Sequence, residues 1–217
     1  MNLCSVDLCK AFDKINHFAL FLKLLKRGLP KQFIAILICW YSKLSSRVKW
    51  GDSFSKRIFL TSGVRQGGVL SPFLFNVLVD DVLDVLGTTK RGCYMKWICM
   101  NSFMYADDLI ILAISLSDLE YLLNLCVGVF KTLGMEINTK KTSCIRIGPR
   151  HNVSISNVFL NGQILLWNQE LNYLGIVLCS AKKFTVNQQK CKQKFFKSIN
   201  GFLVRSASIP LYQFYHH

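Results

Sequence analysis

Two adjacent aspartates inside an apolar segment constrain this chain more than any other feature of the sequence. Asp107 and Asp108 lie in the stretch 101–116, which contains no other charged residue. Neighbouring carboxylates repel each other and lose hydration when they lie among apolar groups. A divalent cation is the simplest compensation, because hard oxygen ligands suit Mg²⁺. The alternative is a polar turn that happens to contain two aspartates, and adjacency alone does not decide between the two.

The other acidic residues are few, so their positions are informative. The chain has 12 acidic residues in total. Asp7 is a second anomaly, because it falls at the end of the apolar run 3–8. Asp13 falls near the start of the next predicted helix, where the helix dipole favours a carboxylate, and we interpret it as structural. The pair Asp80–Asp81 lies inside a predicted helix over 71–86, which predicts a solvated polar face.

The charge balance indicates a polyanionic partner. Lys and Arg total 27, which gives a formal net charge of +15. Nucleic acid is the commonest polyanion, and the alternative is a merely soluble basic protein. The mean hydropathy is +0.30, yet the longest apolar runs, 33–41 and 109–116, are shorter than the roughly 18 to 20 residues of a spanning helix. We therefore expect no membrane partner, and residues 1–10 lack the pattern of a secretory signal.

The cysteines predict reduced thiols. There are nine of them, an odd number, and none are spaced as C-x-x-C. Most lie in apolar segments, which favours core thiols over disulfides or zinc and indicates an intracellular protein, whether nuclear or cytoplasmic. His151 is alone in a loop and 216–217 end the chain, so neither has metal-ligand spacing.

Helical and strand patterns are mixed along the chain, which indicates an α+β domain. Asn16 predicts the cap of a helix that runs to about 27 and ends at Gly28. The next predicted helix, about 31–43, is apolar nearly all round, so we expect it to be buried. Further helices are predicted at 71–86, with Ser71 as the cap and Gly87 as the end, at 117–133, with a capping box over 117–120, and from about 184 onward. Strands are predicted at 3–8, 47–50, 55–60, 103–105, 109–112, 144–147, 153–160, 163–167 and 173–178. Hairpin turns are predicted at 51–52 and at Asn161–Gly162.

Five segments, taken in order, resemble motifs A to E of reverse transcriptases. They are VDLCKAFD at 6–13, SGVRQGGVLSP at 62–72, YADD at 105–108, GMEINTKKT at 134–142 and YLG at 173–175. YADD alone recurs by chance, but the ordered set with an eleven-residue motif B is specific and covers nearly the whole chain. Arg65 ahead of QGG, together with KAFD, is most similar to non-LTR retrotransposons. Group II intron maturases, which usually carry Pro at that position, rank second.

The resemblance implies a fold and an activity. The fold is a palm-type antiparallel sheet packed on helices, with the start of a helical thumb. The activity is RNA-directed DNA polymerase by the two-metal scheme, in which paired Mg²⁺ ions (Mn²⁺ as an alternative) act on the primer hydroxyl and the leaving pyrophosphate. Asp7, Asp107 and Asp108 would hold the metals, with the Leu8 carbonyl as a backbone ligand. The implied partners are an RNA template, a DNA primer and deoxynucleoside triphosphates.

The resemblance also implies the remaining site residues. Phe12 would lie under the incoming sugar and exclude a 2′-hydroxyl, although a core phenylalanine is the alternative. Arg65, Gln66 and Gly67 would contact the nucleotide. Lys141 would donate a proton to pyrophosphate, and since Lys140 is adjacent, the assignment could shift by one. The primer grip would comprise Tyr173, Leu174 and Gly175.

The expected organisation is a palm over 1–180 and the beginning of a basic helical thumb or connection over 181–217. In the family a fingers region precedes motif A, whereas Met1 lies six residues before Asp7. We therefore expect a fragment that is a poor polymerase, or none, by itself. The alternative function is an inactive retrotransposon remnant with residual nucleic-acid binding. An RNA-dependent RNA polymerase is disfavoured by Phe12 and Ala106, and no oligomeric state is predicted.

Overall fold

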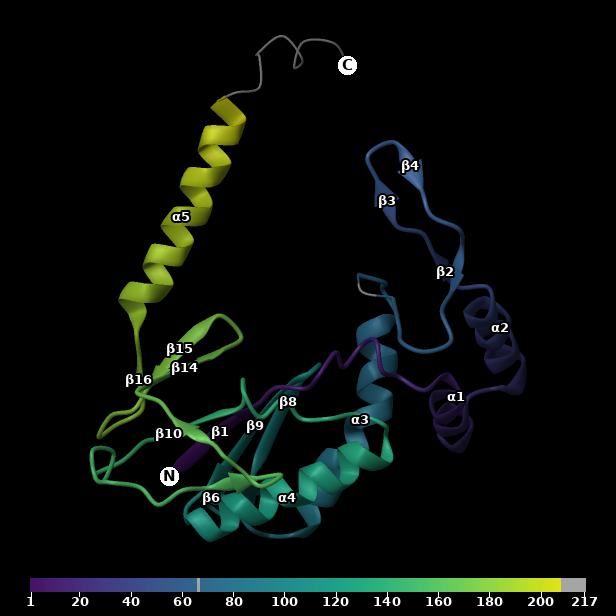
Figure 1. Ribbon diagram of the computed structural model, residues 1–217. Helices are drawn as coiled ribbons and strands as arrows, with labels where there is room; N and C mark the ends of the chain where they lie inside the picture. The colour runs from purple at the N-terminus through teal and green to yellow at the C-terminus, as the bar shows by residue number, and fades with distance from the viewer. Residues whose placement is uncertain (66, 208–217) are drawn as a thin grey trace.

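A five-stranded sheet forms the centre of the molecule. The computed structural model describes residues 1–65 and 67–207, and the strand order of the sheet is β13–β10–β1–β9–β8 (Figure 1). Neighbouring strands are antiparallel except β10 and β13. The predicted strand before motif A is confirmed and lies between the motif C hairpin and the strand that follows motif D. The strands are β1 (Asn2–Val6), β8 (Ser102–Tyr105), β9 (Asp108–Ala113), β10 (Ser143–Arg146) and β13 (Leu166–Trp167).

The side chains of the central strands alternate between two cores, because successive residues of a strand point to opposite faces. Cys4 and Ile111 pack with buried residues of α3 (Ser71–Thr88) and α4 (Leu116–Thr132). Leu3 and Ile110 pack on the other face. That face is covered by a three-stranded sheet formed by β14 (Glu170–Tyr173), β15 (Ile176–Cys179) and β16 (Thr185–Val186).

Two further helices extend the helical layer. Asn16 caps α1 (His17–Lys26) by accepting a hydrogen bond from the Ala19 amide at 3.1 Å, as predicted. Helix α1 packs on α3, and α2 (Lys31–Ser42) packs on α1.

The predicted burial of α2 is wrong. One stripe of this helix, comprising Ile34, Leu37 and Tyr41, is buried. The adjacent stripe, comprising Phe33, Ile36 and Trp40, is exposed. A single neighbouring layer can cover only one stripe of a helix, and α2 lies at the outside of the helical layer.

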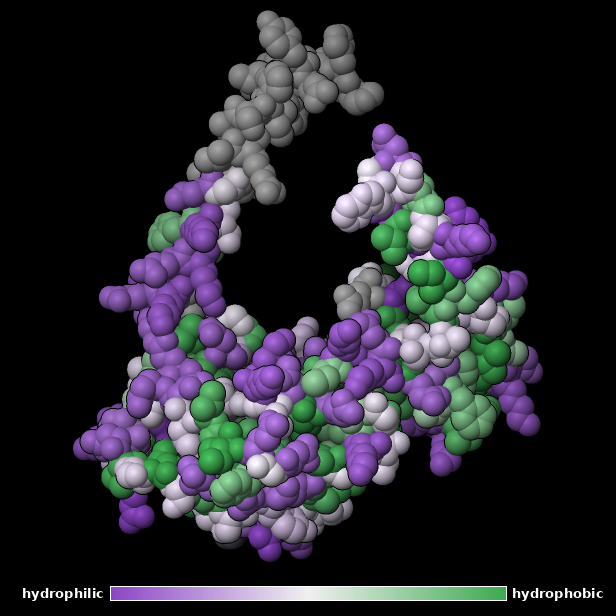
Figure 2. All heavy atoms as spheres, in the orientation of Figure 1, coloured by the Kyte–Doolittle hydropathy of each residue, from purple (hydrophilic) through white to green (hydrophobic). Residues whose placement is uncertain are grey.

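Two arms border a hollow above the sheet. One arm consists of the paired strands β2 (Ser45–Ser46) and β5 (Ile58–Phe59), followed by β3 (Lys49–Trp50) and β4 (Ser53–Phe54). The other arm is α5 (Gln188–Ala207). Figure 2 shows an open space between the arms, with hydrophilic residues along the described side chains of α5. The predicted turn at 51–52 and the predicted C-terminal helix are therefore present, although the pairing along the first arm is interrupted.

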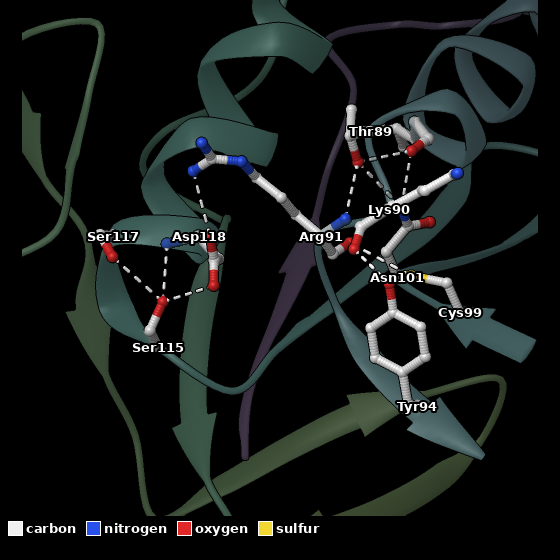
Figure 3. A network of polar contacts seen from close by, with 10 residues as sticks. Thr89, Lys90, Arg91, Tyr94, Cys99, Asn101, Ser115, Ser117 and Asp118 are labelled. Atoms are coloured by element: carbon white, nitrogen blue, oxygen red, sulfur yellow. Dashed lines mark hydrogen bonds and ion pairs between the residues drawn. The ribbon is translucent and has the colours of Figure 1, made fainter. Parts of the chain in front are cut away.

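A short hairpin between α3 and β8 has a firmly anchored base (Figure 3). Its strands are β6 (Cys93–Met95) and β7 (Ile98–Met100). Arg91 pairs with Asp118 at 3.1 Å, and the amide of Asn101 donates to the Leu86 carbonyl at 2.6 Å. Farther along the chain, β11 (Phe159–Leu160) and β12 (Gln163–Ile164) are joined by the predicted Asn161–Gly162 turn, in which both residues have positive φ.

Several predicted boundaries are wrong for identifiable reasons. The predicted capping box at 117–120 is replaced by Ser115, which accepts from the Asp118 amide at 3.0 Å, because α4 begins earlier. Ser71 caps nothing, since its hydroxyl donates to the Arg65 carbonyl. The helix that it begins also continues through Gly87 to Thr88.

The predicted strand over 173–178 is also wrong. It is a hairpin, because Leu174 and Gly175 adopt positive φ and reverse the chain. Of the predicted strand over 153–160, only Phe159–Leu160 is a strand. The alternation of apolar residues predicts the flanking strands, but the residue types in these segments are poor predictors of where the chain turns.

No helix within the described residues is long and apolar enough to cross a bilayer. The cysteines that the structure describes are all free thiols. Cys4, Cys126 and Cys144 are buried in the core on the helical side of the sheet.

Candidate active site

The adjacent aspartates lie at the tip of the β8–β9 hairpin. Tyr105 pairs with Asp108, which leaves Ala106 and Asp107 as a two-residue turn. Ala106 has φ +52°, a left-handed conformation that costs a non-glycine residue roughly 1–2 kcal/mol. The turn places Asp107 at the tip and Asp108 at the first position of β9.

Asp7 lies at the same end of the sheet. It directly follows β1, whose last antiparallel partner in β9 is Leu109, opposite Val6. Continuing this register by one residue sets Asp7 opposite Asp108. The pKa of Asp108 is raised from its ordinary value, first by burial and then by the negative charges of Asp107 and Asp7. The three carboxylates therefore share one electrostatic environment.

The carboxylates are near one another without forming a ready-made cage. Within the described residues, no three or more His, Cys, Asp or Glu side chains converge as metal ligands. Like charges repel, so three carboxylates have no reason to close together until a cation compensates them. Burial first, and then the like charges of Asp107 and Asp7, raise the pKa of Asp108. The hard oxygen donors of the three carboxylates fit a divalent cation such as Mg²⁺.

Motif D holds the other side of Asp7. The Asn138 amide donates to the Asp7 carbonyl at 2.7 Å, and the Asp7 amide donates to the Thr142 hydroxyl at 3.2 Å. Leu8, which is buried, forms an isolated bridge with Ile137. The ammonium of Lys141 lies 3.9 Å from a carboxylate oxygen of Asp7. Lys141, and not the adjacent exposed Lys140, is therefore the lysine paired with Asp7.

A cavity joins motifs A, B and C. It has a volume of about 570 Å³. Phe12 and Asp107 form part of its wall, and the rest comes from motif B and the start of α3. The Phe12 ring also stacks on Phe75 of α3, with centroids 4.8 Å apart, so it serves the core and the cavity together. The lining residues are Phe12, Gly67, Gly68, Val69, Ser71, Pro72 and Asp107.

Glycines allow motif B to approach motif A closely. Gly63 has φ +86°, and a Cβ atom there would lie 2.9 Å from the backbone of Asp13. The Val64 amide donates to the Phe12 carbonyl at 2.8 Å. Arg65 is exposed and lines a neighbouring cavity of about 230 Å³. Gln66, the remaining predicted nucleotide contact in this motif, lies outside the described residues.

The motif E hairpin reaches the acidic turn from the second face of the sheet. The Tyr173 hydroxyl donates to the Asp108 carbonyl at 3.4 Å. Burial, followed by the charge of Asp108, raises the pKa of Tyr173. Leu174 and Gly175 form the tip of this hairpin, and the Leu174 side chain is exposed.

Two contacts of the site were not predicted from the sequence. The first is the Thr142 hydroxyl on the Asp7 amide, and the second is the Ser71 hydroxyl on the Arg65 carbonyl. Thr142 follows the paired lysines of motif D and could have been noticed as a hydroxyl directly before a buried strand. Ser71 was instead interpreted as a helix cap, its commoner role.

Comparison with solved structures defines the class of fold. The chain superimposes on telomerase from Candida albicans with a TM-score of 0.54 and 13% identity, covering 86% of this chain and 30% of that chain. For apo telomerase from Candida tropicalis the TM-score is 0.57 at 13% identity, with 87% and 33% covered. The expected palm-type α+β fold of reverse transcriptases is thus confirmed.

Sequence comparison then gives the family. Residues 2–178 match the family described as reverse transcriptase (RNA-dependent DNA polymerase), and the chain belongs to that family. It is 30% identical over 156 residues to the Pol polyprotein of a type-1 retrotransposable element R2 from Popillia japonica, covering 71% of this chain and 22% of the relative. It is 28% identical over 184 residues to the polymerase of the mobile element jockey from Drosophila funebris, covering 81% and 19%.

A third relative is the 149 kDa protein of transposon TX1 from Xenopus laevis, 30% identical over 188 residues, with 85% and 14% covered. These relatives confirm the resemblance to non-LTR retrotransposons. The chain spans about a quarter or less of the length of the relatives that it matches.

Proposed function

We propose that this chain is the catalytic palm of an RNA-directed DNA polymerase from a non-LTR retrotransposon. One observation carries the proposal: the cavity of about 570 Å³ whose wall includes Phe12, the motif B glycines and Asp107. Three segments far apart in the sequence meet there, beside the end of the sheet where the register of β1 and β9, continued by one residue, sets Asp7 opposite Asp108. A deoxynucleoside triphosphate would occupy this cavity, with the primer end approaching Asp7.

The carboxylates are the proposed metal ligands. Asp7, Asp107 and Asp108, with the Leu8 carbonyl, would hold two Mg²⁺ or Mn²⁺ ions. When bound, such ions would supply the positive charge that activates the primer hydroxyl and neutralises the leaving pyrophosphate. The chain itself would hold Asp7, at the end of β1, beside the β8–β9 turn. The hydrogen bonds between β1 and β9 hold this segment on one side, and motif D holds it on the other.

The remaining residues have proposed roles that follow from their positions. The Nζ atom of Lys141 lies 3.9 Å from a carboxylate oxygen of Asp7, and this side chain would donate a proton to the pyrophosphate. Phe12, braced by Phe75, would form a rigid floor under the sugar and exclude a 2′-hydroxyl. Arg65, Gln66 and Gly67 would contact the nucleotide, and Tyr173, Leu174 and Gly175 would contact the primer strand.

The arms are the proposed binding surface for the RNA template and DNA primer. The arm formed by β2–β5 and its loops exposes Arg47, Lys49, Lys56 and Arg57. On α5, Lys190, Lys194 and Lys197 line one groove, and Figure 2 shows hydrophilic residues along this helix beside the open space. Phosphate contacts of this kind weaken steeply with salt, so binding should be sequence-independent and salt-sensitive. The free thiols support a reducing, intracellular site of action, in the nucleus or the cytoplasm.

The test is single-nucleotide addition to a DNA primer annealed to an RNA template, at saturating protein. We expect slow addition that requires Mg²⁺ or Mn²⁺, because the chain spans a quarter or less of the related polymerases and positioning groups supply about 7–11 kcal/mol in well-oriented reactions. The matched control is Asp107→Asn, which should bind the same duplex without extending it. Salt-sensitive binding with no extension above the Asp107→Asn control would overturn the polymerase proposal in favour of an inactive, nucleic-acid-binding remnant.

A further inference from the structure

The backbone of Asp7 is held on both sides by a single turn. Its carbonyl accepts from the Asn138 amide at 2.7 Å, and its amide donates to the Thr142 hydroxyl at 3.2 Å. The same turn is closed by the Thr142 amide, which donates to the Asn138 carbonyl at 2.9 Å. Both contacts on Asp7 therefore depend on one compact unit.

The Thr142 hydroxyl replaces a missing strand partner. The ladder between β1 and β10 ends where Ser5 pairs with Ser143. Asp7 lies two residues beyond that point, so regular pairing with β10 no longer supplies an acceptor for its amide. Thr142 is 0% exposed, and its side-chain oxygen fills this place. Without it, a part-buried amide would lose its acceptor, which costs about 1–3 kcal/mol.

Lys141, the residue before Thr142, contacts the carboxylate of Asp7 and not its backbone. The Lys141 side chain is mostly exposed, and its ammonium is 3.9 Å from the Asp7 carboxylate. A flexible charged contact at that distance acts on the carboxylate but leaves the backbone free to move. The Thr142 hydroxyl and the Asn138 amide, in contrast, bind the main chain of Asp7 itself, from which the carboxylate projects.

We propose that Thr142 is a positioning residue that holds the Asp7 carboxylate opposite Asp108. Thr142 acts through the Asp7 backbone and touches neither nucleotide nor reacting atoms. The inference rests on the proposed function, since it matters for catalysis only if Asp7 binds the metal. The inference requires a hydroxyl at residue 142 to accept from the Asp7 amide, so a side chain of the same shape without a hydroxyl should not hold Asp7 in place.

The test compares Thr142→Val, which keeps the shape, with Thr142→Ser, which keeps the hydroxyl. Hydrogen exchange of the Asp7 amide, followed by NMR, reports the contact directly. Mn²⁺ affinity, followed by electron paramagnetic resonance on the 217-residue chain, reports the carboxylate position. We expect Thr142→Val to speed exchange and to weaken Mn²⁺ binding about tenfold, the range for losing a group that orients a metal ligand. Thr142→Ser should stay within about twofold of wild type on the same scale.

Thr139→Val is the matched control, because Thr139 lies in the same turn and its hydroxyl bonds Gln163 and not Asp7. It should leave Mn²⁺ affinity unchanged. If Thr142→Val folds poorly, Thr142→Ala against Thr142→Ser gives the same comparison. If Thr142→Val keeps the wild-type Mn²⁺ affinity and the wild-type exchange rate of the Asp7 amide, the inference is overturned. Equal losses of Mn²⁺ affinity in the Val and Ser variants would also overturn it, because they would mean that packing alone matters. A wild-type chain that binds no Mn²⁺ would instead overturn the proposed metal site itself.

Discussion

The molecule contains two pairs of adjacent aspartates that have opposite surroundings. Asp80 and Asp81 lie on α3 and meet the basic side chains of α1. Lys23 reaches Asp80 at 2.7 Å and Asp81 at 2.9 Å, and Arg27 also pairs with Asp80. At the β8–β9 turn, no Lys or Arg of the described residues forms an ion pair with Asp107 or Asp108.

The ion-pair partners of an acidic pair therefore indicate whether the pair is structural or is a candidate for binding a cation from solution. The chain neutralises Asp80–Asp81 with its own cations, so this pair fastens α1 to α3. It leaves Asp107–Asp108 uncompensated, and the pKa of Asp108 is raised as a result of burial and like charge. The predicted solvated face at Asp80–Asp81 is therefore only half right. The signal that could have corrected it is the i,i+4 spacing of Lys23, in α1, and Arg27, at the C-cap of α1.

The largest expected effect separates the two pairs by activity. Asp107→Asn should reduce nucleotide addition by at least about 10³-fold, because a metal-held charge contributes several kcal/mol in the transition state. Asp81→Asn should stay within about threefold of wild type, since Asp81 forms its ion pair with Lys23 and does not line the cavity. Single-turnover extension assays measure both. Similar losses in the two variants would remove the distinction between the pairs.

The second effect concerns stabilisation by metal. Mn²⁺ at about 100 times its dissociation constant should stabilise the wild-type fold by about 2.7 kcal/mol. Thermal melts with and without Mn²⁺ report this as a rise in Tm. The rise should disappear in Asp108→Asn and persist in Asp81→Asn. A rise retained in Asp108→Asn would place the metal elsewhere.

For the stability of the fold, we expect the opposite order: a change at Asp80 should matter more than a change at Asp107. Asp80→Ala should destabilise the fold by about 1–2 kcal/mol, because the Lys23 side chain is only 13% exposed and would lose a charged partner. Urea unfolding of metal-free protein measures it. Asp107→Ala, tested alongside, should be neutral or slightly stabilising, since it removes repulsion. A larger loss for Asp107→Ala would show that the acidic turn has a structural role.

The smallest effect is on the pH dependence of stability. The folded pKa of Asp108 lies above its ordinary value of 3.8, so the folded state binds more protons than the unfolded state between these two values. Its contribution to the free energy of unfolding therefore falls as pH rises through that window. Asp108→Asn should remove this contribution in metal-free protein. An unchanged difference between mildly acidic and neutral unfolding curves would contradict the shift.

Much of the site was predictable because it depends on residue types with few alternatives. A carboxylate in an apolar strand is costly to desolvate, so Asp7, Asp107 and Asp108 were candidates before any fold was known. The residues alone did not decide between a metal site and a polar turn at Asp107–Asp108. The meeting of the three carboxylates in space was implied only by resemblance. It rests on the register of β1 against β9, which local residue patterns do not encode.

The remainder depended on tertiary context. The reversal at Leu174 was not predictable, because leucine rarely adopts positive φ and gives no turn signal. The exposed stripe of α2 looked like core, since hydrophobicity states what a residue prefers and not which neighbour is present. The Thr142 contact joins residues 135 positions apart in the sequence, and no local pattern indicates such a pairing.

The exposed stripe of α2 has a consequence for handling the protein. Phe33, Ile36 and Trp40 form an exposed apolar patch that favours association between molecules. The net charge of +15 opposes this association by electrostatic repulsion. Salt shortens the range of that repulsion to about 3 Å at 1 M. The high-salt wash that removes bound nucleic acid will therefore also promote precipitation, and solubility should be greatest in dilute buffer.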